Sequence, residues 1–587
     1  MQDTQGRAPA WDEEADLVVV GAGAGGMGCA LVAALEGLKA VLVEKSSQVG
    51  GTMSTSAGTI WIPGNTQSRE AGFDDTAEAA DAYMQALTGA PDPSGRRAAY
   101  LESGPQMVDY LRARSDVQFV PCGKHPDYRD MPGAAVTGRA LAPALFDGRL
   151  LGRDFERVRP PIPEFMVLGG MMAGKADIPR LINRFGSVSD FLYAGRLFLR
   201  YLGDRLRFSR GTRLVMGNAL AARLFHSLRR QQVPVLFDST VREMVREGDR
   251  ITGVVLDVAG TPRRIRARKG VVLATGGYGH NPAMRRQFMP APTPPLTVAC
   301  PTNTGDGIAL GQRLGAAVRP ETQGPGAFWT PVSRTRRRDG SQGVFPHLSL
   351  DRAKPGLIAV NGAGRRFVNE AASYHDFVEG MYASHRTAPT MPAYLVCEAA
   401  FVRRYGLGAV HPGTRDLGPA EREGYLATGA TLEELARKIG VDPGALVATV
   451  TRYNGMARAG RDLDFGKGDT QLNRFNGDPA VQPNPCLAPI EQGPFVAVAV
   501  WPAEIGTSTG LETDPNGRVL DAQGRPIGGL YACGADMASV MLGTYPGPGT
   551  TLGPALTFGY RIALHAAGKL GEPRPAAARA ASAAVAA

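Results

Sequence analysis

The chain has 587 residues, of which 43% are hydrophobic and 20% charged, and its formal net charge is +10. This length exceeds the usual size of one domain, so we expect two domains with insertions. Half of the basic excess lies in residues 181–213, which hold seven arginines and two acids, and no nucleic-acid motif accompanies it, so we expect no nucleic-acid partner.

Both ends of the chain are polar or of low complexity. Residues 1–14 contain no basic stretch followed by an apolar run, and residues 571–587 are rich in Ala and Pro, so we expect both segments to be disordered. The six cysteines have no CxxC spacing, which indicates free thiols in a reducing compartment. No run of 18 apolar residues occurs, so the sequence predicts a cytoplasmic protein without a transmembrane segment.

The first elements of the chain form a β-α-β pattern around a glycine-rich turn. Residues 16–20 are an apolar run typical of a buried parallel strand. A helix over 27–36 and a strand over 40–43 follow the turn. In this context the turn and the helix N-terminus face a pyrophosphate, and the acid after the second strand binds a ribose hydroxyl. The sequence therefore predicts a dinucleotide site, with a structural glycine turn as the alternative; the candidate contacts are Gly21, Ala22, Gly23, Gly25, Gly26 and Glu44.

Residues 160–213 contain a basic amphipathic segment, FLYAGRLFLRYLGDRLRF at 191–208. At 100° per residue, Arg196, Arg200 and Arg207 fall within about 40° of one another. A broad apolar face lies opposite, made of Phe191, Phe198, Leu202 and Leu206. This combination is typical of an interfacial helix that meets anionic headgroups. We expect the insertion to attach the chain to a membrane surface; a lid over the active site with solvated arginines is the alternative.

Two further strands are predicted at 233–237 and 253–258, and we expect them to form a pair. Another strand is predicted at 270–274. Residues 326–494 are mixed and punctuated by Pro and Gly, strands return from 495, and a helix is expected over 555–567. We therefore expect an α/β fold, with a Rossmann-like FAD-binding domain over 15–325 and 495–570. An α+β catalytic domain that caps the substrate, residues 326–494, is inserted into it.

Several segments distinguish FAD from NAD by resemblance. Gly50-Gly51-Thr52, Ala274-Thr275-Gly276-Gly277, Thr304-Gly305-Asp306-Gly307 and Tyr531-Ala-Cys-Gly534-Ala-Asp536 resemble FAD enzymes of the fumarate reductase and ketosteroid dehydrogenase superfamily. The resemblance covers about 14–570 and implies bound FAD, with Asp536 on a ribityl hydroxyl. The further contacts it implies are Lys45, Gly50, Gly51, Thr52, Ser56, Ala57, Gly58, Val241, Ala274, Thr275, Gly276, Asp306, Gly534, Asp536, Thr551 and Leu552.

Residues 543–559 hold the most specific stretch, Tyr545-Pro-Gly-Pro-Gly549 followed by a helical run. It is similar to the YPGPG signature of the 3-ketosteroid Δ1-dehydrogenases. The resemblance implies that the Tyr545 hydroxyl and the Gly549 N–H bind the C3 ketone, as in an oxyanion hole. Asn369-Glu370-Ala-Ala-Ser-Tyr374 resembles the family segment whose tyrosine abstracts the C2 proton, and Tyr128 is its expected hydrogen-bonded helper, although the flanking Arg129 departs from the family pattern.

The resemblance implies 1,2-desaturation of a 3-ketosteroid or sterol-derived 3-ketone, with hydride transfer from C1 to flavin N5. An external electron acceptor, a quinone or a redox protein, would reoxidise the flavin. The alternatives are a ketosteroid Δ4-(5α)-dehydrogenase, a fumarate-type reductase and a flavin-binding protein without turnover. The eight histidines show no metal-binding spacing, so no metal is expected, and His375 is the one histidine beside a candidate site residue.

Overall fold

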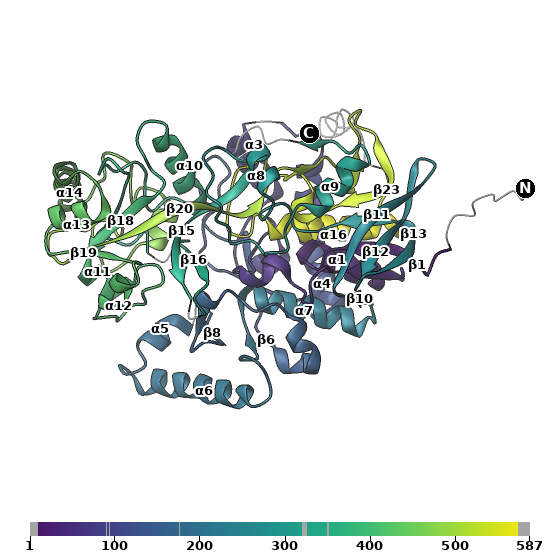
Figure 1. Cartoon of the computed structure of the whole chain (residues 1–587), viewed down its shortest axis with the longest axis horizontal. Helices are drawn as coiled ribbons and strands as arrows, with labels where there is room; N and C mark the ends of the chain where they lie inside the picture. The colour runs from purple at the N-terminus through teal and green to yellow at the C-terminus, as the bar shows by residue number, and fades with distance from the viewer. Residues whose placement is uncertain are drawn as a thin grey trace, which may run out of the picture.

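The structure is a computed structural model that describes residues 10–89, 91–92, 94–174, 177–319, 326–337, 339–348 and 351–572. Most of the terminal residues expected to be disordered lie outside these ranges. The described residues form two bodies, each built on its own β-sheet, which lie side by side along the long axis of the molecule (Figure 1).

An eight-stranded sheet forms the first body, in the order β10-β2-β1-β13-β12-β23-β22, with β11 paired to β12. The strands that carry the glycine turn and its neighbours run parallel, and β1 and β2 are buried hydrophobic runs, as expected for a sheet covered on both faces. The strands are β1 (Glu13–Val20), β2 (Ala40–Val43), β10 (Val235–Leu236), β11 (Ser239–Glu247), β12 (Arg250–Val258), β13 (Thr261–Leu273), β22 (Arg518–Leu520) and β23 (Pro526–Ala532).

Helices α1 (Ala24–Leu35) and α16 (Leu552–Ala566) pack against one another beside this sheet. The same body contains α2 (Thr66–Glu70), α3 (Ala77–Thr88), α4 (Arg96–Arg114), α7 (Met216–Arg230), α8 (Pro282–Phe288), α9 (Asp306–Arg313) and the short strands β3 (Ile60–Trp61), β4 (Phe119–Pro121), β5 (Ala140–Pro143), β6 (Phe146–Asp147), β9 (Arg213–Leu214), β14 (Val318–Arg319) and β21 (Gly510–Leu511).

The predicted pairing of strands 233–237 and 253–258 is wrong. Strand β10 joins the parallel edge at β2, whereas β12 lies between β11 and β13 in antiparallel register. The intervening β11 reads STVREMVRE and exposes its charged side chains, so its sequence lacks the apolar run that marked its neighbours.

A six-stranded sheet forms the second body, in the order β16-β15-β20-β18-β17, with β19 paired to β20. The long central strand β20 pairs with β18 through its first half and with β15 through its second half. The elements are β15 (Ala327–Arg336), β16 (Gln342–Pro346), β17 (Leu357–Val360), β18 (Ala393–Glu398), β19 (Ala427–Gly429), β20 (Phe495–Thr507), α10 (Tyr374–His385), α11 (Ala399–Tyr405), α12 (Gly418–Arg422), α13 (Leu432–Ile439), α14 (Pro443–Arg458) and α15 (Gln471–Asn476). The predicted α/β class, a Rossmann-like body with a second α+β body, is confirmed.

The basic insertion lies at the lower edge of the molecule in Figure 1, where α6 stands apart from both sheets. It contains β7 (Met166–Val167), β8 (Met171–Met172), α5 (Asp177–Ile182) and α6 (Val188–Arg205). Asp204 is the one residue of α6 that is buried. Within the described ranges no helix combines the length and the apolar composition that a membrane crossing requires.

Candidate active site

A cavity of about 2370 Å³ extends from the ends of β1, β2 and β13 to the second body and to α6. This volume is more than twice that of a typical small-molecule pocket, roughly 300–1,000 Å³. One cavity therefore has room for a dinucleotide and a second large ligand.

The glycine-rich turn forms one end of the cavity. Gly21 has φ +107°, and a Cβ there would lie 2.2 Å from the Ala274 carbonyl oxygen, so only glycine fits. Gly23 is the N-cap of α1 and has no side-chain cap, and a Cβ at this position would meet nothing within 4 Å. The free N–H groups of the first turn thus face open space, which suits the pyrophosphate of a dinucleotide.

Acidic and basic side chains complete this end of the cavity. The Glu44 carboxylate accepts hydrogen bonds from the Ala22 and Ser46 N–H groups, each at 2.9 Å, and so lies directly beside the turn. The Lys45 ammonium donates to Asp306 at 2.7 Å. These residues and the uncapped helix fit FAD.

All the cofactor-binding candidates except Gly26, Gly50 and Asp536 line the cavity. Gly26 packs behind the turn, where a Cβ would lie 1.9 Å from the Gly21 carbonyl oxygen. Asp536 is completely buried and accepts hydrogen bonds from the Thr275 and Gly277 N–H groups. This carboxylate therefore holds the turn after β13, and its expected contact with a ribityl hydroxyl stays a prediction.

The three candidate tyrosines meet at the junction of the two bodies. The Tyr128 hydroxyl donates to the Tyr374 hydroxyl at 3.2 Å. The Tyr545 ring stacks on Tyr128 at 5.6 Å and meets the Tyr374 ring edge-on at 5.2 Å. Burial raises the pKa of Tyr374 and Tyr545 well above the ordinary value of 10. All three phenols are thus protonated and able to donate when no ligand is bound.

The loop before α16 brings a backbone donor to the same place. Gly549 has φ +99°, and a Cβ there would lie 2.5 Å from the backbone of Ile60, so the position requires glycine. Within the described residues its N–H has no hydrogen-bond acceptor. Both Gly549 and Tyr545 line the cavity, so two donors are available to one carbonyl oxygen.

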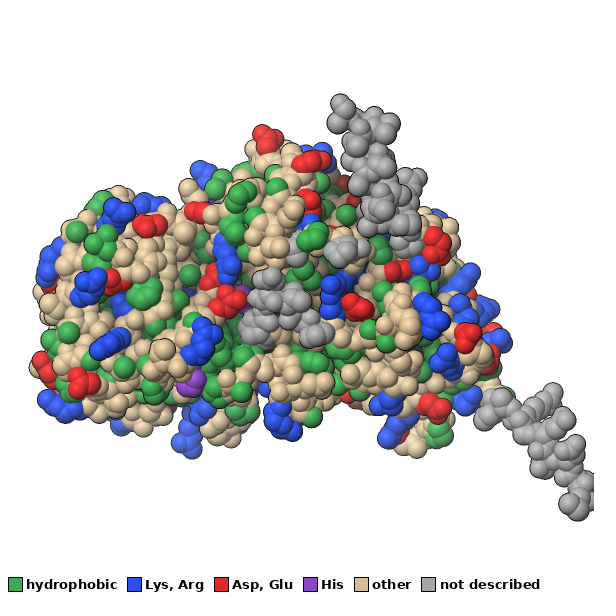
Figure 2. Space-filling model, turned by 90° about the horizontal axis from the view of Figure 1, so that it is seen from above, with side chains coloured by type: hydrophobic (Ala, Val, Ile, Leu, Met, Phe, Trp, Pro, Cys, Tyr) green, Lys and Arg blue, Asp and Glu red, His purple; other side chains and the backbone are tan. Residues whose placement is uncertain are grey.

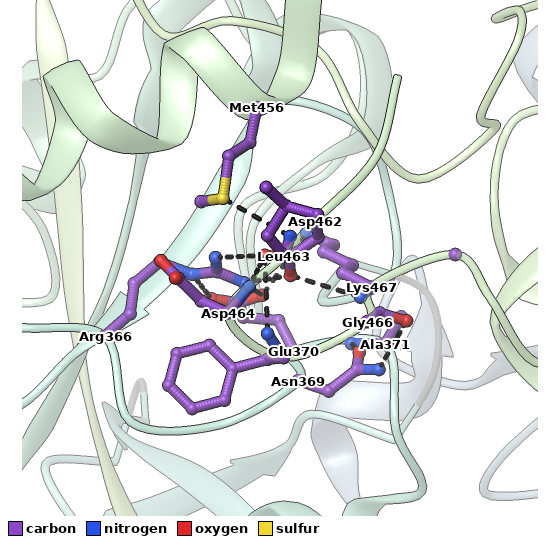
Figure 3. Close-up of polar contacts among 12 residues, drawn as sticks. Arg366, Asn369, Glu370, Ala371, Met456, Asp462, Leu463, Asp464, Gly466 and Lys467 are labelled. Atoms are coloured by element: carbon purple, nitrogen blue, oxygen red, sulfur yellow. Dashed lines mark hydrogen bonds and ion pairs between the residues drawn. The ribbon is translucent and has the colours of Figure 1, made fainter. Parts of the chain in front are cut away.

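The segment that precedes Tyr374 is held by a buried network of charges (Figure 3). The Arg366 guanidinium lies between the carboxylates of Glu370 and Asp462, at 2.8 Å from each. The Lys467 ammonium lies 3.8 Å from Glu370. The Asn369 amide donates to the Gly466 carbonyl oxygen at 3.2 Å. The Asn-Glu pair quoted above therefore anchors the loop that ends at the candidate base.

The sequence did not predict the structural role of Arg129. Its guanidinium donates to the Asp376 carboxylate at 3.1 Å and to the Glu379 carboxylate at 3.0 Å. Since Asp376 lies in the first turn of α10, this contact ties the Tyr128 loop to the helix that begins with Tyr374. The departure from the expected pattern at this position was the only sequence signal.

His375 is buried and serves the packing of the site. Its Nδ1 atom accepts the Trp329 N–H at 3.2 Å, and its Nε2 atom lies 3.4 Å from Glu379. Its ring centroid is 5.7 Å from that of Tyr545. It therefore supports the tyrosines without lining the cavity.

Comparisons with known proteins show the family of the chain. A model of the family described as FAD binding domain matches residues 16–552. The chain is 38% identical to 4-oxocyclohex-2-ene-1-carboxylate 5-dehydrogenase of Sinomonas cyclohexanicum, over 93% of this chain and 92% of the relative. It is 37% identical to 3-oxosteroid 1-dehydrogenase of Mycolicibacterium smegmatis, over 94% and 97%.

The fold also matches a solved structure. A crystal structure of 3-ketosteroid Δ1-dehydrogenase from Sterolibacterium denitrificans, in complex with 1,4-androstadiene-3,17-dione, superposes with a TM-score of 0.87 at 38% identity. The match covers 95% of this chain and 100% of that one. The residues that fit FAD, the cluster of tyrosines and the similar proteins are thus all consistent with an FAD-dependent dehydrogenase.

Proposed function

The chain belongs to the FAD-binding family that contains the 3-ketosteroid Δ1-dehydrogenases, and from this premise we propose that it desaturates the C1–C2 bond of 3-ketosteroids. The observation that carries the proposal is that Tyr128, Tyr374 and Tyr545 contact one another at the wall of a large cavity, which Gly549 with its free N–H also lines. When bound, FAD supplies the hydride acceptor. An external acceptor, a quinone or a redox protein, then regenerates it.

The protein residues activate the ketone and take a proton. Hydrogen bonds from the Tyr545 hydroxyl and the Gly549 N–H would stabilise negative charge that develops on the C3 oxygen. This polarisation acidifies the C2–H. Tyr374 accepts that proton as a phenolate, after its own phenolic proton has been released to solvent. Tyr128 orients Tyr374, since its hydroxyl donates to the Tyr374 oxygen at 3.2 Å.

The shape and lining of the cavity favour a steroid over a small cyclic ketone. Beyond the tyrosines, apolar side chains line it as far as α6; they include Met166, Val167, Leu168, Ile178, Leu181 and Ile182. Burial of a rigid apolar ring system against such a lining is favourable at about 25 cal/mol per Å².

Anaerobic reduction of the bound flavin tests the proposed substrate. A 3-keto-4-ene steroid should bleach the flavin absorbance, and product NMR should show a 1,4-diene-3-one. 4-Oxocyclohexanecarboxylate, the other ketone class named among the relatives, serves as the comparison. If only the small acid bleaches the flavin, the steroid proposal is wrong. A 5α-3-ketosteroid, which is saturated at C4–C5, serves as a third substrate, and its conversion to a 4-ene-3-one without a C1–C2 double bond would indicate a Δ4-(5α)-dehydrogenase instead.

The exposed face of α6 supports a second proposal, attachment to a membrane surface. Leu192 and Leu199 of α6 are exposed, and Phe185 and Leu206, which flank the helix, are 80% and 85% exposed. Figure 2 shows the upper face of the molecule, away from α6, where acidic and basic side chains are interspersed among the rest. Exposed apolar side chains beside arginines are typical of an interfacial helix.

The same helix also covers the apolar end of the cavity, which is lined by Phe191, Ala194, Gly195 and Phe198. One helix can therefore act both as a lid over the cavity and as the site of membrane attachment. Since a steroid partitions into lipid, a cavity that ends beneath an interfacial helix would take its substrate from the bilayer.

Liposome co-sedimentation of the holoenzyme tests the attachment. A variant with Leu192, Leu199 and Leu206 changed to Ser should lose lipid binding and keep its flavin, because these side chains do not line the cavity. Leu463→Ser, at an exposed leucine of the second body, is the matched control. Wild-type protein that stays in the supernatant with anionic and neutral vesicles alike would show that α6 is only a lid.

A further inference from the structure

A buried arginine is bonded to the loop that carries the proposed base. Arg352 is 2% exposed. Its guanidinium donates to the carbonyl oxygens of Glu370 at 2.8 Å and Ala372 at 3.2 Å, which lie just before Tyr374. It also donates to the carbonyl oxygens of His347 at 2.8 Å and Leu348 at 2.7 Å.

No carboxylate among the described residues forms an ion pair with this guanidinium, although the negative charges of Asp351, Glu370 and Asp376 act on it. Its sequence neighbour Asp351 lies 2.6 Å from the His347 ring and accepts the Arg352 backbone N–H. Glu370 is paired with Arg366 and Lys467, and Asp376 with Arg129. Burial lowers the pKa of Arg352 to about 10, so the guanidinium remains charged at neutral pH.

The groups around Tyr374 make this charge relevant to proton transfer. Burial is the largest cause that raises the pKa of Tyr374, and the neighbouring Tyr128 raises it further. A hydrogen bond with Tyr545 lowers it, and the positive charge of Arg352 lowers it by a smaller amount. Arg352 is therefore the cation that opposes the cost of forming a buried phenolate.

We propose that Arg352 is a positioning residue that fixes the Tyr374 loop through two carbonyl contacts and stabilises the Tyr374 phenolate through its positive charge. The inference rests on the proposed desaturation, in which Tyr374 takes the proton. The proposal also gives a reason for an arginine at this position. Uncharged donors could satisfy the four carbonyl oxygens and hold the loop, but they would not stabilise the negative charge of the phenolate.

The pH dependence of kcat/KM for a 3-keto-4-ene steroid separates these two parts of the role. Arg352→Gln removes the charge, so its profile should shift by on the order of one pH unit to the alkaline side, with activity at neutral pH lower by about tenfold. Arg352→Lys keeps the charge and should retain the wild-type profile with a lower kcat. A ring-fluorinated tyrosine at position 374, whose phenol is more acidic, should move the Arg352→Gln profile back.

Arg285→Gln is the control, because Arg285 is also buried and donates to the carbonyl oxygens of Gly279, Pro294 and Leu296. It differs from Arg352 in its ion pair with Glu504 at 3.4 Å. It is not bonded to the Tyr374 loop, so its profile should stay in place. A folded, flavin-containing Arg352→Gln enzyme with the wild-type profile would overturn the inference, and so would an alkaline shift in Arg352→Lys. If Arg352→Gln yields no holoenzyme, the Arg352→Lys profile decides. A wild-type enzyme that fails to turn over the steroid contradicts the proposed function instead.

Discussion

Replacement of Tyr545 by Phe removes one hydroxyl and leaves its packing intact. The ring stacks on Tyr128 at 5.6 Å and meets Phe328 edge-on at 5.3 Å, so a phenylalanine fits the same space. The lost hydroxyl is one of two donors proposed for the ketone oxygen. Loss of one such donor costs about 3 kcal/mol, which lowers kcat by roughly 10²–10³-fold. The Gly549 N–H remains, so residual turnover should persist.

Anaerobic single-turnover bleaching of the bound flavin measures this change directly. Tyr382→Phe is the control, because Tyr382 lies on α10 with its hydroxyl 3.2 Å from that of Thr293 and does not line the cavity; it should react at nearly the wild-type rate. Tyr374→Phe should lose at least as much activity as Tyr545→Phe, because it removes the base. If Tyr545→Phe keeps its flavin and reacts within tenfold of wild type, the hydroxyl is not a ketone donor.

Three further outcomes follow from the geometry. Gly26→Val should abolish FAD binding, because a Cβ there would lie 1.9 Å from the Gly21 carbonyl oxygen; yellow purified protein would contradict this. Burial raises the pKa of the Glu504 carboxyl to about 7, so the folded protein favours the protonated form. The stability that this carboxyl contributes is full below its ordinary pKa and is lost as pH rises through 7. Glu504→Gln should therefore gain on the order of 3 kcal/mol relative to wild type at alkaline pH, and a pH-independent difference in Tm would refute it. Arg129→Met should lower kcat about tenfold by freeing the Tyr128 loop from Asp376, with partial rescue by Arg129→Lys; an unchanged kcat would show that the ion pair does not position the tyrosines.

The features that the sequence predicted correctly depend on local chain geometry. The glycine turn, α1 and the Tyr545–Gly549 loop are each specified within about twenty residues, because glycines and prolines fix their own backbone conformation. The cofactor and the family followed from these stretches and are confirmed by the comparisons. The roles of the individual tyrosines remain predictions.

The features that the sequence did not predict depend on partners far away in the chain. Arg129 binds Asp376, 247 residues later, and Arg352 binds carbonyl oxygens, which any residue type can supply. Neither contact leaves a pattern in the residue types. The strand β11 was missed for another reason: its faces are charged and exposed, so hydrophobic periodicity is weak there.

The division of the site between two sheets separates the groups proposed to bind the ketone from the group proposed to remove the proton. Tyr545 and Gly549 belong to the loop before α16, whereas Tyr374 begins α10, which packs on β15 of the other sheet. Exchange of residues 326–494 for the same segment of a relative would thus move the base along the substrate ring while the carbonyl oxygen stays in place. Which carbon is deprotonated can diverge between relatives through this one segment, without any change in how the ketone is recognised.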